Sequence, residues 1–312
     1  MECVDTLLSS LADNSWTQYN SSLKLWWHFC QSFGHNIYAP TSSTLLSFLQ
    51  LMFSEGKSYS SLNTMRSAVS LLAPRANLGE DSFITRFFKG VGRVAPPKRK
   101  YNFIWDPAPV LSYLSSLHPF HKLSYYEITL KTIGLLALAT AHRVQTFSKI
   151  NVNNIHTFSD RIEILIEDNL KTSRPGKFQP CLVLPFFIDN PQLCAASAIT
   201  EYLKITKKFR SPGPEMQKLF LSVSKDHTPV SSQTISRWIK TVLKSSGVDT
   251  TIYTAHSTRH AATTTAKNSG VPIDIIRDRA GWTATSSCFA NFYNRPIDRR
   301  SDFAHSVLLS SI

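Results

Sequence analysis

Several features common in secreted, membrane and metal-dependent proteins are missing from this 312-residue sequence. It has five cysteines, which are scattered and form no C-x-x-C pair, so a disulfide framework is not expected. The first residues, MECVDTLLSS, carry acidic side chains where a secretory signal would be basic. The apolar run TIGLLALATA is too short to span a membrane. We therefore expect a soluble, intracellular protein with no membrane partner.

Acidic residues are also scarce. The sequence has 21 Asp and Glu against 34 Lys and Arg, which gives a formal net charge of +13. The acids form no cluster, and this disfavours nucleases that hold two metal ions with carboxylates. The excess of positive charge favours an anionic partner, such as nucleic acid or an anionic surface.

The N-terminal third of the chain has hydrophobic residues at helical spacing. Four segments between Ser15 and Val94 show this pattern, which predicts a small helical bundle over residues 1–95. The first segment ends at Gly34, and its buried stripe is predicted to consist of Trp16, Tyr19, Leu23, Trp26, Trp27, Cys30 and Phe33.

A basic linker is predicted over residues 96–103, PPKRKYNF, where two prolines precede three cations. Lys98, Arg99 and Lys100 fit a solvated loop, a contact with phosphate groups, or a nuclear-import signal.

Residues 104–312 predict a second, larger domain that is mainly helical. The segment YYEITLKTIGLLALATAHRVQTFSKI reads as a mostly buried helix that runs into a polar break. Residues Ile162, Ile164 and Ile166 alternate with charged or exposed ones, and Cys181 and Val183 resume the alternation. This pattern predicts a β-hairpin with a basic tip, and therefore one small antiparallel sheet.

The stretch TAHSTRHAA, residues 254–262, places His256, Arg259 and His260 on one face of a predicted helix. Two histidines four residues apart can bind zinc, but the H-E-x-x-H motif needs a glutamate where this chain has Ser257. An always-charged Arg259 would also repel a dication. Taken alone, the stretch fits the start of a helix whose histidines are buried and hydrogen-bonded. The functional alternative is that these three side chains face a phosphate.

Motifs elsewhere in the chain favour the interpretation in which these side chains face a phosphate. Arg143 follows a long apolar helix, Lys171 lies at the predicted hairpin tip, and Trp282 and Tyr293 follow the His-Arg-His stretch. In the order R, K, HxxRH, GW and Y, the chain resembles the tyrosine recombinase (phage integrase) family over nearly its whole length. The segment RHAATTTAKNSGVPIDIIRDRAGW also resembles recombinases of eukaryotic Crypton and DIRS mobile elements.

The resemblance implies a mainly α fold. An N-terminal four-helix core-binding (SAM-like) domain, residues 1–95, would precede an α+β tyrosine recombinase catalytic domain with a small antiparallel sheet, residues 104–312. It implies strand cleavage and rejoining on double-stranded DNA through a 3′-phosphotyrosyl link. No metal, cofactor or ATP is expected, and the partners would be DNA and further copies of the chain in a tetramer. The setting would be the nucleus in a eukaryotic host and otherwise the cytoplasm.

The resemblance also assigns roles to individual residues. Two guanidinium groups would clamp the phosphate, a tyrosine would attack it, a lysine would protonate the leaving 5′ oxygen, and further side chains would assist. The two guanidinium groups are those of Arg143 and Arg259, the attacking tyrosine is Tyr293, and the lysine is Lys171, with Lys177 as the alternative. His256 would act as an acid or base, Trp282 would donate a hydrogen bond to the phosphate, and His260 would orient its neighbours. Lys98, Arg99 and Lys100 would contact the DNA backbone.

Some alternatives stay open at this stage. The family commonly has an acid three residues after its first arginine, where this chain has Thr146. Tyr253 competes with Tyr293 for the role of nucleophile. A type IB topoisomerase shares the tyrosine chemistry, and a non-catalytic DNA-binding protein derived from a recombinase would share the fold. The apolar residues Phe303, Val307 and Leu308 near the C-terminus are predicted to pack on a neighbouring protomer.

Overall fold

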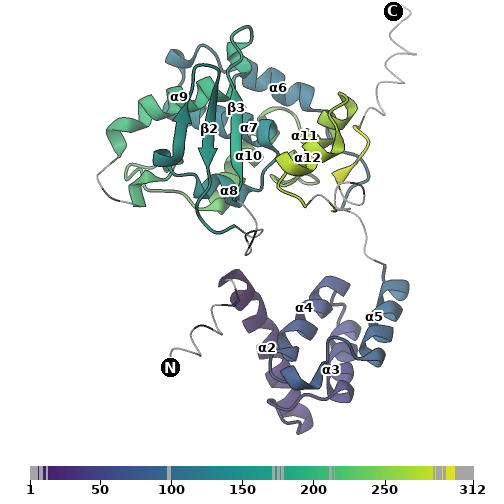
Figure 1. Cartoon of the computed structure of the whole chain (residues 1–312). Coiled ribbons are helices and arrows are strands. Elements are labelled where there is room, and N and C mark those ends of the chain that lie inside the picture. The colour runs from purple at the N-terminus through teal and green to yellow at the C-terminus, as the bar shows by residue number, and fades with distance from the viewer. Residues whose placement is uncertain are drawn as a thin grey trace, which may run out of the picture. The chain divides into compact units, whose positions relative to one another are not determined.

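The fold of the chain is known from a computed structural model. The described residues are 6, 10–11, 13–96, 100–170, 173, 176, 179–210, 213, 215–283, 285, 290 and 293–298. The chain divides into two compact units, Met1–Arg99 and Lys100–Ile312, which are traced by colour in Figure 1.

The N-terminal unit is helical. Its described helices are α2 (Asp13–Phe33), α3 (Ser42–Ser54), α4 (Tyr59–Ser70) and α5 (Ser82–Val94). Side-chain oxygens of Thr41, Ser58 and Asp81 accept hydrogen bonds from backbone N–H groups at the starts of α3, α4 and α5, which fixes where these helices begin.

The core of this unit differs in part from the predicted stripe on α2. Trp26 and Cys30 are buried as predicted, and Phe29 joins them. Trp27 and Phe33, however, are 47% and 60% exposed, so their assignment to the core was wrong. The helix buries a narrower face than the sequence suggested because only α4 packs extensively along it.

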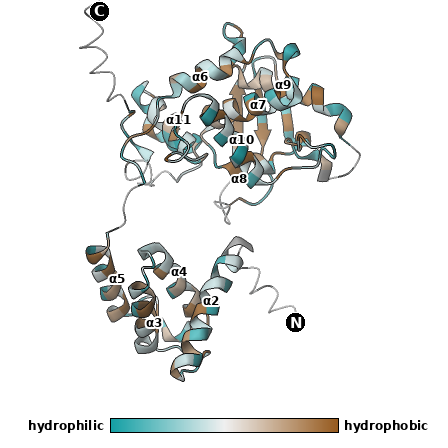
Figure 2. Cartoon of the chain, turned by 180° about the vertical axis from the view of Figure 1, so that it is seen from behind, coloured by the Kyte–Doolittle hydropathy of each residue, from teal (hydrophilic) through white to brown (hydrophobic). Residues whose placement is uncertain are grey.

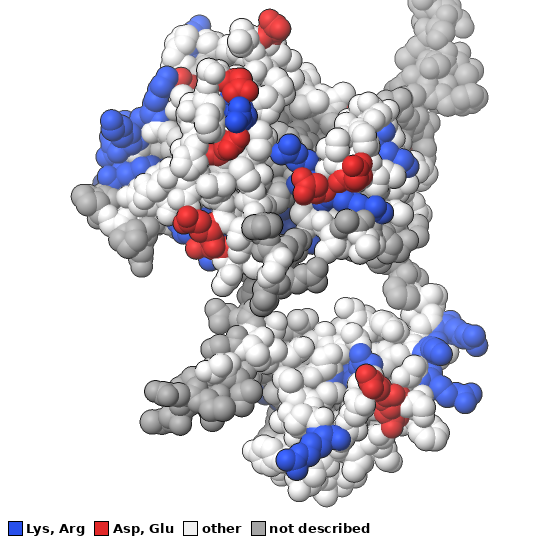
Figure 3. Space-filling model, in the orientation of Figure 1, with Lys and Arg blue, Asp and Glu red and all other residues white. Residues whose placement is uncertain are grey.

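Helix α5 has two distinct faces. Ile84, Phe88 and Val91 are buried in the unit, and hydrophobic residues are visible along α3 and α5 in Figure 2. The exposed cations of α5 are Arg86, Lys89 and Arg93. Their spacing places these three cations, hereafter the α5 basic stripe, along one side of the helix. Figure 3 shows Lys and Arg side chains gathered over this helix.

The C-terminal unit is built around α7 (Tyr125–Thr140), which is buried along most of its length. Helices α9, α10 and α11 pack against it. The other helices are α6 (Pro107–Ser116), α8 (Val144–Lys149), α9 (Ala195–Thr206), α10 (Ser232–Ser245), α11 (Ser257–Asn268) and α12 (Ile273–Arg279). Among the described residues, no helix combines the length and apolar character that crossing a membrane requires.

A three-stranded antiparallel sheet of order β1-β2-β3 covers one face of these helices (Figures 1 and 2). The strands are β1 (Ile155–Thr157), β2 (Arg161–Leu165) and β3 (Cys181–Pro185), and β1 had not been predicted. Ile162 and Ile164 of β2 are buried, as their alternation predicted.

The buried face of β3 is the opposite of the one predicted. In the observed register, Ile162 pairs with Leu184 and Ile164 with Leu182, so these two leucines share the buried face. Cys181 and Val183 are only half-buried and point to the other side. The whole stretch CLVL is hydrophobic, so only the pairing with β2 decides which alternate residues face the core.

Candidate active site

The start of α11 brings His256, Arg259 and His260 together. His256 is the last residue before the helix, and the other two lie in its first turn. His256 is exposed, whereas Arg259 and His260 are 2% and 7% exposed. The predicted helical spacing therefore holds, but only the first of the three side chains opens widely to solvent.

Tyr293 lies against this helix start. Its hydroxyl and Nε2 of His256 form a hydrogen bond of 2.9 Å. Its ring stacks on the ring of His260, with 4.2 Å between the centroids, and lies 4.6 Å from the ring of Trp282. Residues far apart in the sequence thus converge on one phenol. His256, Arg259, His260, Trp282 and Tyr293 are called the Tyr293 cluster below.

Arg259 is held inside the cluster by its neighbours. Its Nη2 donates a hydrogen bond of 3.1 Å to the carbonyl oxygen of Ala280. Its guanidinium lies 5.3 Å from the ring centroid of Trp282 and 5.4 Å from that of Tyr293, within cation–π range. Arg259 is therefore packed among aromatic rings and is almost fully buried.

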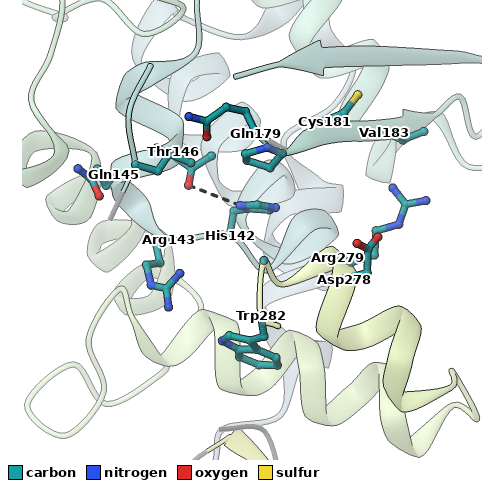
Figure 4. Close-up of a pocket in the computed structure, with 13 residues that line it drawn as sticks. His142, Arg143, Gln145, Thr146, Gln179, Cys181, Val183, Asp278, Arg279 and Trp282 are labelled. Atoms are coloured by element: carbon teal, nitrogen blue, oxygen red, sulfur yellow. Dashed lines mark hydrogen bonds between the residues drawn. The ribbon is translucent and has the colours of Figure 1, made fainter. Parts of the chain in front are cut away.

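Arg143 occupies the joint between α7 and α8. Helix α7 ends at Thr140 and is followed by Ala141, whose φ of 51° is left-handed, and Arg143 directly precedes α8. The half-buried Arg143 lines a cavity of about 360 Å³ together with Gly281 and Trp282. Figure 4 shows Arg143 and Trp282 at this cavity, which is called the Arg143 cavity below.

The cavity also contains His142, a residue that the sequence analysis missed. It is 8% exposed, and its Nδ1 lies 3.5 Å from the hydroxyl of Thr146 (Figure 4). Burial, and then the positive charges of Arg259 and Arg143, lower the pKa of His142 to about 4. His142 is therefore neutral at physiological pH. Both guanidinium groups are thus close enough to His142 to lower its pKa.

Tyr253, the alternative nucleophile, has a different environment. Its hydroxyl donates a hydrogen bond of 3.2 Å to the carbonyl oxygen of Phe103. Its ring packs at 5.1 Å from that of Tyr101. Of the two tyrosines, Tyr293 is the one whose hydroxyl bonds to His256 and whose ring lies beside Arg259.

The predicted lysines are described only in part. Lys171 and Lys177 lie outside the described residues, as do Lys98 and Arg99, while Lys100 is exposed. The loop that carries Lys171 and Lys177 joins β2 to β3, and the described residues Leu170 and Gln179 near its ends line the Arg143 cavity. Within the described parts of the chain, no group of three His, Cys, Asp or Glu side chains could hold a metal ion.

Comparison with known proteins identifies the family. The sequence model of the phage integrase family matches residues 114–299, and no curated protein matches the chain in sequence. One similar solved structure is a lambda integrase tetramer bound to a Holliday junction, with 16% identity, 96% of this chain and 78% of that chain covered, and a TM-score of 0.52.

Two further solved structures have TM-scores of 0.56. One is the XerH site-specific recombinase bound to a palindromic difH substrate, with 14% identity and coverage of 86% of this chain and 72% of that chain. The other is the Tn1549 transposon integrase in complex with transposon right-end DNA, with 18% identity and coverage of 88% and 87%. At these identities the likeness shows a common fold. The family match spans more than half of the chain, which therefore belongs to the phage integrase family and is a tyrosine-type DNA strand transferase.

Proposed function

We propose that the protein is a site-specific recombinase or integrase of a mobile element, and that it cleaves and rejoins double-stranded DNA through Tyr293. The observation that carries this proposal is the hydrogen bond between the Tyr293 hydroxyl and His256, with the guanidinium of Arg259 beside the same ring. A nucleophile needs an adjacent base and a nearby positive charge when its target is a phosphate, and this arrangement supplies both.

In the proposed cleavage step, Oη of Tyr293 forms a bond to the scissile phosphorus while the bond from phosphorus to the 5′ oxygen breaks. The tyrosine proton passes to Nε2 of His256, which accepts it in the neutral imidazole. The leaving 5′ oxygen takes a proton from Lys171, or from Lys177. The products are a 3′-phosphotyrosyl link and a free 5′ hydroxyl, and the reverse attack restores the DNA.

Arg143 and Arg259 stabilise the charge that builds up on the non-bridging oxygens. Each guanidinium offers a planar fork of donors, which can hold two phosphate oxygens at once. Trp282 offers its indole N–H to the same phosphate, and His260 orients the phenol by stacking on it. Because the phosphotyrosyl link conserves the energy of the broken bond, joining needs no ATP, and the arginines supply the charge that a metal would otherwise bring.

Basic side chains of both units would bind the phosphate groups of the DNA backbone. The α5 basic stripe adds Arg86, Lys89 and Arg93 to the linker residues Lys98, Arg99 and Lys100. The solved relatives include a tetramer on a Holliday junction, and we extend that assembly to this chain. The C-terminal residues Phe303, Val307 and Leu308, which lie outside the described residues, would pack on a neighbouring protomer.

The exchanged segment would begin after Asp298. The backbone N–H of Asp298 donates a hydrogen bond of 2.7 Å to the carbonyl oxygen of Ile104 in the same chain. Because this contact ties Asp298 to its own chain, we propose that the exchanged segment starts after it.

A nicked suicide substrate carrying the ends of the element tests the proposal. Cleavage should leave a covalent protein–DNA adduct because the short fragment with the free 5′ hydroxyl diffuses away, and EDTA should not reduce the yield. Exchange between two sites would support a recombinase, whereas relaxation of supercoils without exchange would indicate a topoisomerase. DNA binding without any adduct would indicate a non-catalytic derivative and contradict the proposal.

A further inference from the structure

One buried hydroxyl of α11 forms hydrogen bonds with main-chain groups of Tyr293 and Arg295. Thr264 is 1% exposed. Its Oγ1 donates a hydrogen bond of 2.9 Å to the carbonyl oxygen of Tyr293 and accepts one of 3.3 Å from the backbone N–H of Arg295. The roles assigned to the Tyr293 cluster do not include this residue.

Its neighbour on the helix shows that this arrangement is specific. A threonine inside a helix commonly bonds back to the carbonyl oxygen four residues earlier. Thr263 does so, since its Oγ1 donates a hydrogen bond of 2.6 Å to the carbonyl oxygen of Arg259. The hydroxyl of Thr264 instead bonds to a segment about thirty residues later in the chain.

Further contacts hold the same segment. Nζ of Lys267, one turn further along α11, donates a hydrogen bond of 3.0 Å to the side-chain oxygen of Asn294. The N–H of Ile104 donates a hydrogen bond of 2.9 Å to the carbonyl oxygen of Pro296, and Ile104 also pairs with Ile297 in a parallel bridge. Residues 293–298 are therefore held at several consecutive positions by hydrogen bonds to other segments of the same chain.

We propose that Thr264 is a positioning residue that fixes the main chain of Tyr293 relative to His256. This inference rests on the proposed function. His256 and Thr264 are eight residues apart, which corresponds to about 12 Å along a helix. One end of α11 thus holds the phenol hydroxyl and a later turn holds the backbone. Because the main chain is held, rotation of the phenol about its side-chain bonds would leave the Tyr293 backbone at the same distance from His256.

The test compares three substitutions of buried helix hydroxyls. Thr264→Val keeps the shape but removes both hydrogen bonds, Thr264→Ser keeps the hydroxyl, and Thr263→Val is the matched control on the adjacent position. The rate of covalent cleavage is measured in a single turnover on a saturating nicked half-site. DNA affinity, melting temperature and hydrogen exchange at the Arg295 amide are measured on the same proteins.

Thr264→Val should cleave about 10- to 100-fold more slowly than the native protein, because small misplacements of a reacting group cost about that much. Its DNA affinity should be unchanged, and the Arg295 amide should exchange faster. Thr264→Ser should stay within about 3-fold of the native rate, as should Thr263→Val, since reactivity depends on the placement that the Thr264 hydroxyl sets.

Three results would overturn the proposal. They are native cleavage by Thr264→Val, an equally slow Thr264→Ser, and a loss of affinity or melting temperature that accounts for the whole loss of rate. If the native protein forms no adduct, the proposed function fails instead. The exchange rate at Arg295 then still decides whether Thr264 holds this segment.

Discussion

The Tyr293 cluster and the Arg143 cavity, which are the two parts of the proposed site, differ in how far their arginines are exposed. In the cluster, Arg259 is 2% exposed and lies under the rings of Trp282 and Tyr293. In the cavity, Arg143 is half-buried and lines an open volume of about 360 Å³. The guanidinium of Arg143 is therefore more accessible to a phosphate than that of Arg259.

The largest effect is expected at Arg259, because this guanidinium packs inside the cluster and is also one of the two groups of the proposed phosphate clamp. Arg259→Ala should lower the single-turnover cleavage rate by about 10³-fold or more, and should also lower the melting temperature. Arg259→Lys should restore little activity, since a point charge cannot make the forked contact. Full activity of the lysine variant would contradict the clamp.

Substitution of Arg143 should impair the proposed clamp without disturbing the packing of the Tyr293 cluster. Arg143→Ala should slow cleavage by about 10²- to 10³-fold, the cost of removing one preorganised donor. Its melting temperature should stay close to that of the native protein, because the side chain lies at an open cavity. Equal losses of stability in the Arg143 and Arg259 variants would contradict the view that Arg259 supports the packing of the site and Arg143 does not.

His142 allows a pH-dependent test of the proposed site, because its pKa depends on both Arg259 of the cluster and Arg143 of the cavity. Its pKa of about 4 in the folded protein lies below the ordinary value near 6.5, so the unfolded chain binds more protons between these two pH values. The free energy of unfolding should therefore fall as the pH drops from about 6.5 to 4, by about 2 to 3 kcal/mol from this residue.

The control for this prediction is His142→Gln, which is neutral at every pH. Denaturant unfolding at pH 7 and pH 4 should show a smaller loss of stability in the variant than in the native protein. An identical loss in both proteins would mean that the pKa of His142 is not lowered in the folded protein.

The smallest expected effect concerns the α5 basic stripe, which lies in the other unit. Replacing Arg86, Lys89 and Arg93 by glutamine should weaken binding to all DNA sequences alike and flatten its salt dependence, by up to about 0.9 for each phosphate that the variant no longer neutralises. Fluorescence anisotropy over a salt series measures this slope. The charge-matched control replaces the exposed Lys204, Lys207 and Lys208 of the C-terminal unit. An unchanged slope in the α5 variant would place the DNA elsewhere.

Only the part of the Tyr293 cluster at the start of α11 has a local geometry that the sequence could predict. Helical spacing alone puts His256, Arg259 and His260 on one face, and the order of the motifs indicated Trp282 and Tyr293. The four N-terminal helices were also predictable, since each carries its own apolar spacing and end signals such as Gly34.

Features that depend on long-range contacts could not be predicted in this way. The buried face of β3 follows from its pairing with β2, and the contact of Thr264 with Tyr293 joins residues about thirty positions apart. The environment of His142 depends on the close approach of Gly281 and on the charges of two arginines from separate elements. A histidine and a threonine four residues apart, at 142 and 146, were the only local signal.

The identity of the nucleophile is the most direct test of the account. Nicked substrate should be incubated with the native protein, Tyr293→Phe and Tyr253→Phe, and the DNA-linked peptide should be mapped by mass spectrometry. We predict an adduct on Tyr293 in the native protein and in Tyr253→Phe, and none in Tyr293→Phe, which should still bind DNA. An adduct that persists in Tyr293→Phe, or that maps to Tyr253, would contradict the assignment of the site.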